Sequence, residues 1–250
     1  MGISSIATAG GGGTLTSFDA LWNALAAQSP ADSDTDYFSD ASLDGSWSEF
    51  DLASAVVVTE EASEGLKLAS TSTAGEAVAG ILKAAPSHST YNVTAQIRAN
   101  ATVENYLRVG LALSEGTGST DNIVLHCFLF QSGTSYPWIE ATRFNAYNAF
   151  GARIQYFQNE MGLLADCAYF RCHVTATTMQ FLISGNGRNW LAIGDPVTIT
   201  THLPGGITNV GICVNNNATS TAHDVYSSMF RIDDTSDPFE AIGSALQARV

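Results

Sequence analysis

The sequence predicts an all-β protein, an antiparallel jelly-roll β-sandwich with a short N-terminal arm that contains one amphipathic helix. From Asp36 onwards, segment after segment alternates apolar and polar residues, which is typical of strands with one buried face. Turns rich in Gly, Ser and Asn separate these segments, and no convincing long helix lies between them. A hydrophobic content of 45% in 250 residues supplies enough apolar side chains for a sizeable core.

Residues 1–35 are predicted to form an arm in front of the sandwich. The glycine-rich start "MGISSIATAGGGG" is followed by "TSFDALWNALAAQ", in which Ser17 suits the N-cap of a helix over 18–28. One helix face carries the apolar side chains of Phe18, Leu21, Trp22 and Leu25. Because a single short helix has no core of its own, we expect these four residues to anchor the chain in an assembly.

Residues 36–235 hold the predicted strands, and residues 236–250 are expected to form a C-terminal tail. The segment "YNVTAQIRA" puts Tyr91, Val93, Ala95 and Ile97 on one face, and "YLRVGLALS" does the same for Leu107, Val109, Leu111 and Leu113. The segment "IVLHCFLF" is apolar on both faces, which predicts a central strand.

Composition and charge exclude several partners. The net charge of −14 repels phosphate backbones and anionic membranes, so we expect neither nucleic acid nor membrane as a partner. The start of the chain lacks the basic residues and apolar block of a secretory signal, so export by that route is not expected. The four cysteines, Cys127, Cys167, Cys172 and Cys213, are therefore expected to be reduced.

Three stretches carry a family resemblance. "DYFSDASLDGSW" at 36–47, "YFRCHVTATTMQFLISGNGRNWLAIG" at 169–194, and "VGICVNNN" followed by "MFRIDD" resemble concanavalin A-like lectin/glucanase and laminin-G-like sandwiches. The resemblance spans about residues 36–235 and implies a jelly roll of the kind found in sugar-binding modules, glycan hydrolases and phage virion proteins. The corresponding tryptophan of that family packs at the end of a hairpin, so we expect Trp190 to plug the core and not to stack on a sugar.

Catalytic residues are not expected. Glycoside hydrolysis needs two carboxylates that flank the scissile bond, and the glucanases of the resembled family supply them from a Glu-x-Asp-x-x-Glu run. This chain has no such run, and Glu140 stands alone on its predicted strand face, with Thr142 and Phe144 where partners would fall. We therefore predict a protein that is not an enzyme.

No metal site is expected from the Cys and His residues. In "CAYFRCHV", alternation puts Cys172 in the core and turns Arg171 and His173 outwards, so a zinc site would need unusual convergence. Calcium is left open, because loop residues Asp121, Asn122, Asp195 and Asp233 could supply oxygen ligands. No other cofactor is predicted.

The segment "SYPWIEATRFNAYNAF" at 135–150 is the best candidate for sugar contact. It combines aromatic rings with amide side chains, and the candidate carbohydrate-binding residues are Tyr136, Trp138, Asn145, Tyr147 and Asn148. The alternative is that these side chains pack on the sheet or contact a neighbouring subunit, since aromatic residues are enriched in both kinds of interface.

Two functions from different classes follow. The first is a virion structural protein of a tailed phage, namely a capsid decoration, head fibre or tail-associated protein, located in the virion. Its partners are other virion proteins and copies of itself, with a host surface glycan left open. The low charge (14% of residues) and the arm favour this function. The alternative is a carbohydrate-binding module that recognises a cell-surface glycan.

Overall fold

The computed structural model describes residues 35–51, 55–61, 64–71, 75–100, 106–131, 137–157, 167–217, 223–234 and 236–239. The chain divides into two compact units, Met1–Ser33 and Asp34–Val250, and every described residue belongs to the second. The predicted arm helix with Phe18, Leu21, Trp22 and Leu25 lies outside the described residues. In the part that is described, no helix is long and apolar enough to cross a membrane.

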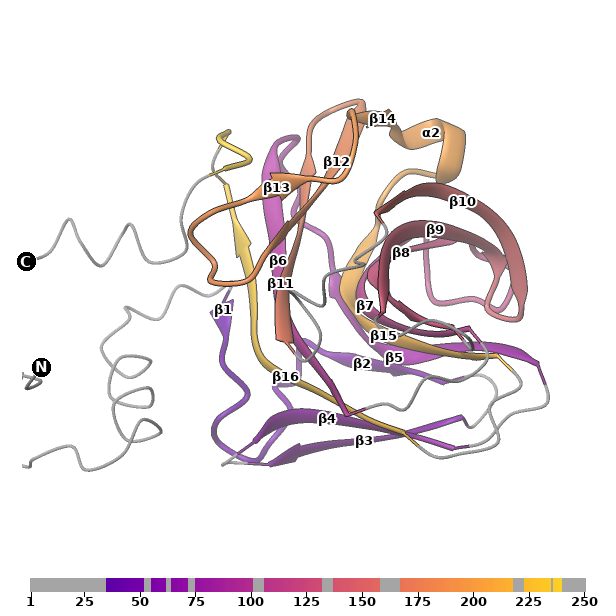
Figure 1. Ribbon diagram of the computed structural model, residues 1–250, viewed down its shortest axis with the longest axis vertical. Coiled ribbons are helices and arrows are strands. Elements are labelled where there is room, and N and C mark those ends of the chain that lie inside the picture. Colours follow the sequence, from indigo (N-terminus) through magenta and orange to yellow (C-terminus); the bar gives the residue numbers. More distant parts are fainter. Residues whose placement is uncertain are drawn as a thin grey trace, which may run out of the picture. The chain divides into compact units, whose positions relative to one another are not determined.

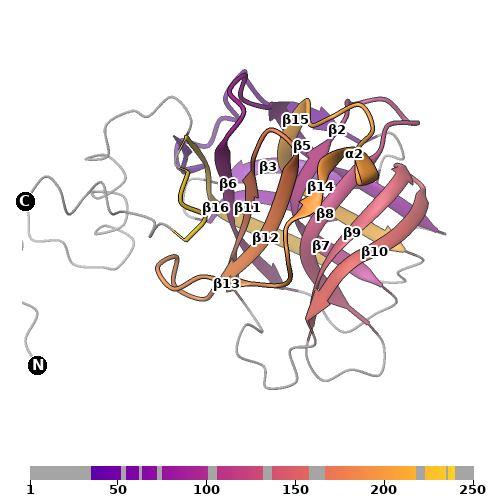
Figure 2. The same cartoon turned by 90° about the horizontal axis from the view of Figure 1, so that it is seen from above.

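The second unit consists of two antiparallel sheets that form separate layers (Figures 1 and 2). Sheet A has the order β13-β12-β11-β6-β16-β4-β3, with β1 paired to β16 and β14 paired to β12. Its strands are β1 (Thr35–Asp36), β3 (Val56–Glu61), β4 (Gly65–Ser70), β6 (Tyr91–Asn100), β11 (Cys167–Val174), β12 (Thr178–Ser184), β13 (Leu191–Ala192), β14 (Val197–Thr198) and β16 (His223–Asp233).

Sheet B has the order β10-β9-β8-β7-β15-β5-β2. Its strands are β2 (Ser48–Phe50), β5 (Glu76–Ala84), β7 (Leu107–Ser114), β8 (Ile123–Phe130), β9 (Trp138–Ala146), β10 (Ala149–Phe157) and β15 (Asn209–Asn217). A short helix, α2 (Ile199–His202), follows β14. The predicted all-β antiparallel sandwich is confirmed.

The main core lies between the sheets and has the predicted faces. The alternating residues of β6 and β7 named above, Tyr91 to Ile97 and Leu107 to Leu113, are all buried in it. The strand β8 is buried along its whole length and lies between β7 and β9, as its two apolar faces predicted. His126 points into this core, where its Nε2 lies 2.7 Å from the Leu182 carbonyl oxygen of sheet A. Burial lowers the pKa of His126 to about 4.

Sheet B curls over its outer face, the face turned away from sheet A. Strands β8, β9 and β10 are strongly curved arcs (Figure 1). The Tyr147 carbonyl in the β9–β10 turn accepts a hydrogen bond from the Val78 amide of β5, which lies on the far side of the sheet. Small residues on this face allow the curl, since Gly80, Cys213, Gly110 and Cys127 are successive partners across the sheet. The face is filled by a second apolar cluster that includes Val78, Leu125 and Phe144.

The opening stretch "DYFSDASLDGSW" joins the start of the sandwich to its last strand. The Asp36 carboxylate accepts a 2.7 Å hydrogen bond from the Trp47 indole N–H. The Trp47 ring packs on Phe38 and edge-on against Phe230 of β16, at centroid distances of 5.8 and 4.8 Å. The aspartate and the tryptophan of this stretch are therefore a structural pair at the edge of the core.

The outer face of sheet A differs from the prediction at β11. Cys172 lies in the core as expected, but Arg171 and His173 are buried although they point outwards. Residues 236–239 cover them, and the Pro238 carbonyl accepts a 3.0 Å hydrogen bond from Arg171 Nη1. The Nε of Arg171 donates a second hydrogen bond to the Thr94 hydroxyl. Because alternation predicts which way a side chain points but not what lies above it, the sequence did not reveal this burial.

Trp190 covers the same arginine, so the prediction of a core plug is wrong. The tryptophan is half-buried and lies outside the core cluster, and its ring centroid is 3.9 Å from the Arg171 guanidinium carbon. A polar turn precedes it, held by the Asn186 side-chain oxygen, which accepts hydrogen bonds from the amides of Arg188 and Asn189. The ring therefore stabilises a buried cation on the outer face of sheet A.

Candidate functional site

The candidate site lies on the outer face of sheet B, at the end where β5 and β7 begin and β8 ends. Strand register brings the residues together: Arg108 of β7 pairs with Leu129 of β8, which pairs with Trp138 of β9. Two residues further along the same face, Cys127 of β8 pairs with Glu140 of β9, and Glu140 pairs with Tyr156 of β10. We call this group the outer-face site, and its residues are Glu76, Tyr106, Arg108, Trp138, Glu140, Arg153 and Tyr156.

A charge network forms the buried floor of the outer-face site. Glu140 is fully buried, and both of its carboxylate oxygens accept hydrogen bonds, at 2.6 Å from Arg108 Nε and at 2.7 Å from Arg153 Nε. Arg108 is itself only 3% exposed and lies 4.0 Å from Glu76. The Arg108 side chain reaches across β8 to Glu140 of β9. The residues beside its path, Gly110 of β7 and its partner Cys127 of β8, are small and leave room for it. Buried charges of this kind are stable only when they are paired.

Aromatic rings surround the network. The rings of Trp138 and Tyr156 stack at a centroid distance of 6.1 Å, and the Arg153 guanidinium lies 5.6 and 5.2 Å from them. Arg108 has Tyr106 at 5.8 Å and Phe150 at 5.1 Å. Tyr156 is 57% exposed, the largest exposed fraction among the aromatic side chains described as exposed, whereas Arg153 next to it is held in place by Glu140. The site therefore presents rigid ring surfaces to solvent above a fixed array of charges.

Of the two carboxylates in the network, Glu76 lies nearer to solvent, since its side chain is 16% exposed and that of Glu140 is fully buried. Burial raises the pKa of its carboxyl above the ordinary value, while the hydrogen bond from Asn215 and the charge of Arg108 act in the opposite direction. Asn215 and Asn217 of β15 both donate to this carboxylate. Two carboxylates, Glu76 and Glu140, thus meet around one arginine although they come from strands far apart in the sequence.

The structure distributes the sequence-predicted sugar residues over two places. Trp138 begins β9 and belongs to the outer-face site. Asn145, Tyr147 and Asn148 lie at the other end of β9 and in the following turn, where Tyr147 packs against the second apolar cluster. Tyr136 lies outside the described residues. The segment 135–150 is therefore not one continuous contact surface.

Sequence reasoning missed five residues of the outer-face site: Glu76, Tyr106, Arg108, Arg153 and Tyr156. One signal was present: Arg108 interrupts an otherwise apolar strand, "LRVGLALS", and every residue of that strand is buried. A charged residue in such a position needs a buried partner of opposite charge, and Glu140 was an acid without an assigned partner two strands further along the chain. The strand order that joins them was not visible from the sequence.

Metal ligands do not gather among the described residues. No group of three or more His, Cys, Asp or Glu side chains there is arranged to hold a metal ion. The calcium candidates are spread over the β7–β8 turn (Asp121 and Asn122), the segment after β13 (Asp195) and the end of β16 (Asp233). Cys127, Cys172 and Cys213 are free and buried.

The two-sheet sandwich of this chain is similar in fold to parts of solved glycoside hydrolase structures. No protein-family model matches the sequence, and no curated protein matches it. The GH43 protein BlXynB from Bacillus licheniformis is similar at a TM-score of 0.62 and 14% identity, over 82% of this chain and 40% of that one. The xylan beta-1,4-xylosidase from Bacillus halodurans C-125 is similar at a TM-score of 0.52 and 13% identity, over 80% of this chain and 39% of that one.

Another solved structure is matched along nearly its whole length. It comes from a report that prominent members of the human gut microbiota express endo-acting O-glycanases to initiate mucin breakdown. The TM-score is 0.55 at 9% identity, over 81% of this chain and 98% of that one. Likenesses at such low identity show the fold alone, and this chain spans about 40% of the length of BlXynB.

These neighbours overturn the expectation that the protein is not an enzyme. That expectation rested on the missing Glu-x-Asp-x-x-Glu run, yet the same fold occurs in GH43 glycoside hydrolases, including a xylosidase. In this structure two carboxylates from different strands, Glu76 of β5 and Glu140 of β9, lie at the same arginine.

Proposed function

We propose that this protein binds a glycan through the outer-face site. The observation that carries the proposal is the exposed Tyr156 ring, stacked with Trp138 and backed by Arg153 over a buried carboxylate. Sugars present apolar C–H faces and a rim of hydroxyl groups. An aromatic ring covers the first, and a fixed guanidinium donates hydrogen bonds to the second. The likeness to glycoside hydrolase structures supports the same ligand class.

Preorganisation favours this site. Arg153 and Trp138 are already held by Glu140 and Tyr156 without a ligand, so binding immobilises few side chains, and little of the binding free energy is lost to ordering. The neighbouring charges balance, since two arginines face two glutamates, which suits a neutral glycan better than an anionic one.

Calorimetric titration with soluble xylan, β-glucan and mucin-type oligosaccharides tests the proposal. Tyr156→Ala should weaken binding at least about tenfold, which corresponds to about 1.4 kcal/mol. The matched control is Tyr226→Ala, because Tyr226 is also a tyrosine next to an arginine, Arg98 at 4.5 Å, but lies on sheet A. Equal affinities for the wild type and Tyr156→Ala, or an equal loss in the control, would refute the outer-face site.

A second candidate, hydrolysis of the bound glycan, is favoured by the position of Glu76. Its raised pKa suits a general acid, and it shares Arg108 with Glu140. Glu140 would then act as a positioning residue, because it is fully buried and both of its oxygens are held by arginines, whereas the hydrogen bonds to Glu76 come from the neutral amides of Asn215 and Asn217. Release of reducing ends that disappears in Glu76→Gln, while binding persists, would support hydrolysis; turnover that survives in this variant would rule out Glu76 as the acid.

A role as a virion structural protein stays a prediction from the sequence. It depends on the arm, whose anchor residues Phe18, Leu21, Trp22 and Leu25 lie outside the described residues. Incorporation of the purified chain into phage particles, compared with a variant that lacks residues 1–35, remains the measurement that tests it.

A further inference from the structure

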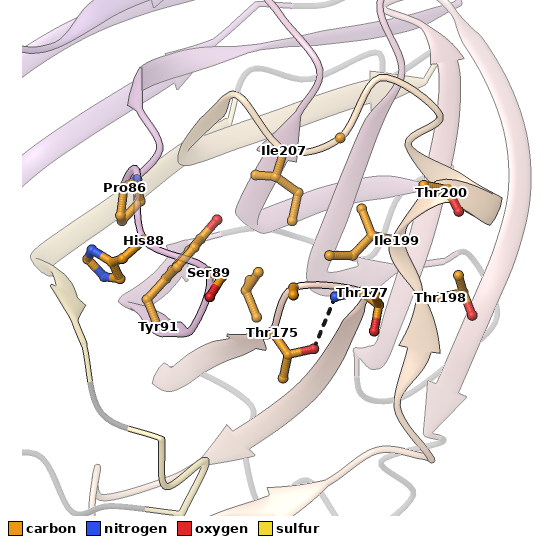
Figure 3. Close-up of a pocket in the computed structure, with 13 residues that line it drawn as sticks. Pro86, His88, Ser89, Tyr91, Thr175, Thr177, Thr198, Ile199, Thr200 and Ile207 are labelled. Atoms are coloured by element: carbon orange, nitrogen blue, oxygen red, sulfur yellow. Dashed lines mark hydrogen bonds between the residues drawn. The ribbon is translucent and has the colours of Figure 1, made fainter.

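A pocket of about 380 Å³ lies at the opposite end of the sandwich from the outer-face site (Figure 3). It is formed by the segment between β5 and β6, the β11–β12 turn, and the chain from β14 through α2 to Ile207. The outer-face site holds Glu76 at the start of β5, whereas this end pocket begins after Ala84, where β5 ends. The two places therefore share no residue.

The buried floor of the end pocket is apolar, and its exposed rim is rich in residues that carry hydroxyl groups. Tyr91, Val174 and Ile199 are buried, and Ile207 packs partly on the core, so these side chains make the floor. Four exposed lining residues carry hydroxyl groups: Ser89, Thr177, Thr198 and Thr200. Of the described lining residues, none carries a carboxylate, ammonium or guanidinium group. Apart from the imidazole of His88, such a wall offers no group that compensates a charge on a ligand, so it favours a neutral ligand over an ion.

Tyr91 gives the pocket a directed polar group. The residue is only 3% exposed, and no hydrogen bond joins its hydroxyl to another described residue. The hydroxyl points towards the pocket, and the His88 ring packs edge-on against the tyrosine at 5.6 Å (Figure 3). A hydroxyl that opens onto a pocket and has no protein partner can exchange hydrogen bonds with a water or a ligand there. Burial also raises the pKa of Tyr91, so the group stays a neutral donor.

We infer that the end pocket binds a small neutral polyhydroxylated ligand, one or two sugar rings, with the Tyr91 hydroxyl as a hydrogen-bond partner at its floor. A sugar ring matches both parts of the wall, because its C–H face fits the floor and its hydroxyls meet the Ser and Thr rim. The volume lies at the lower end of the range for small-molecule sites, which fits this ligand size. The inference is independent of the outer-face site and makes the protein bivalent towards a neutral glycan.

Amide chemical shifts in a titration of the full ¹⁵N-labelled chain test the inference. The probes are glucose, xylose and cellobiose, with glucuronic acid as the charged counterpart of glucose. The neutral probes should shift the amides of Ser89, Tyr91 and Thr177, and glucuronic acid should bind more weakly than glucose. Tyr91→Phe keeps the ring and removes only the hydroxyl, and should weaken binding about fivefold, the effect of one hydrogen bond. Ser89→Trp should abolish binding by filling the opening.

Three results would overturn the inference. The first is that no neutral probe shifts the amides of the end pocket, and the second is that Tyr91→Phe and Ser89→Trp bind sugar as tightly as the wild type. The third is that the pocket binds glucuronic acid more tightly than glucose. Trp138→Ala separates the two sites. If this variant loses all sugar-dependent shifts while Tyr91→Phe and Ser89→Trp keep them, the end pocket is not a sugar site and the outer-face proposal stands. If the reverse holds, the outer-face proposal fails and the end pocket stands.

Discussion

The buried network of Arg108, Glu140 and Arg153 makes a quantitative prediction. Arg108→Met removes one partner of a fully buried carboxylate and leaves Glu140 with Arg153 alone, so it should lower the free energy of unfolding by about 3–5 kcal/mol. Glu140→Met leaves the buried Arg108 with Glu76 at 4.0 Å as its remaining carboxylate and with its hydrogen bond to the Tyr106 carbonyl, and should cost a similar amount. The double variant puts two apolar side chains where the pair was and should cost much less than the sum, since neither charge remains buried alone.

Urea unfolding at neutral pH, followed by tryptophan fluorescence, measures these free energies. The matched control is the pair Arg98 and Glu64, which lies at a comparable 2.9 Å but has side chains that are 50% and 45% exposed. Arg98→Met should cost at most about 1 kcal/mol, because solvent screens this pair. If the costs of Arg108→Met and Glu140→Met simply add within about 0.5 kcal/mol, the two side chains are not coupled and the network described here is wrong.

Three further predictions follow. The pKa of His126, about 4 in the folded state and 6.5 in the unfolded chain, means that its contribution to stability is full above pH 6.5 and is lost as the pH falls towards 4. Between pH 7 and 5 this loss should be about 2 kcal/mol, and urea titrations should show a flatter pH dependence in His126→Gln; identical slopes would contradict it. Trp190→Ala removes a ring from a buried guanidinium and should cost about 1–2 kcal/mol in thermal or urea unfolding, so a loss of 3–5 kcal/mol would restore the core-plug interpretation. Gly110→Ala should destabilise the sandwich strongly in the same assay, because a Cβ there would lie 2.2 Å from the His126 carbonyl oxygen, and an unchanged midpoint would show that the curl of sheet B is looser than described.

The candidate site was only partly predictable. Trp138 was named from its aromatic neighbourhood, and Glu140 was noticed as a lone acid, because each stands out within a single strand. Their partners, Arg108 and Arg153, come from β7 and β10, and pairing across strands depends on sheet order, which no local pattern encodes. The end pocket was missed for the same reason, since it joins the segment after β5 to the β11–β12 turn and α2.

The sequence by itself determined the fold class, the faces of the long strands and the central position of β8. These features follow from period-two alternation, which decides locally which side chains leave water. Tertiary structure alone decided what covers each outer face. Arg171 is buried because residues 236–239 and Trp190 lie over it, and Glu140 is buried because sheet B curls around it. The physical reason is that burial of a charged side chain depends on partners from distant segments, and only the folded chain brings those partners within hydrogen-bond distance.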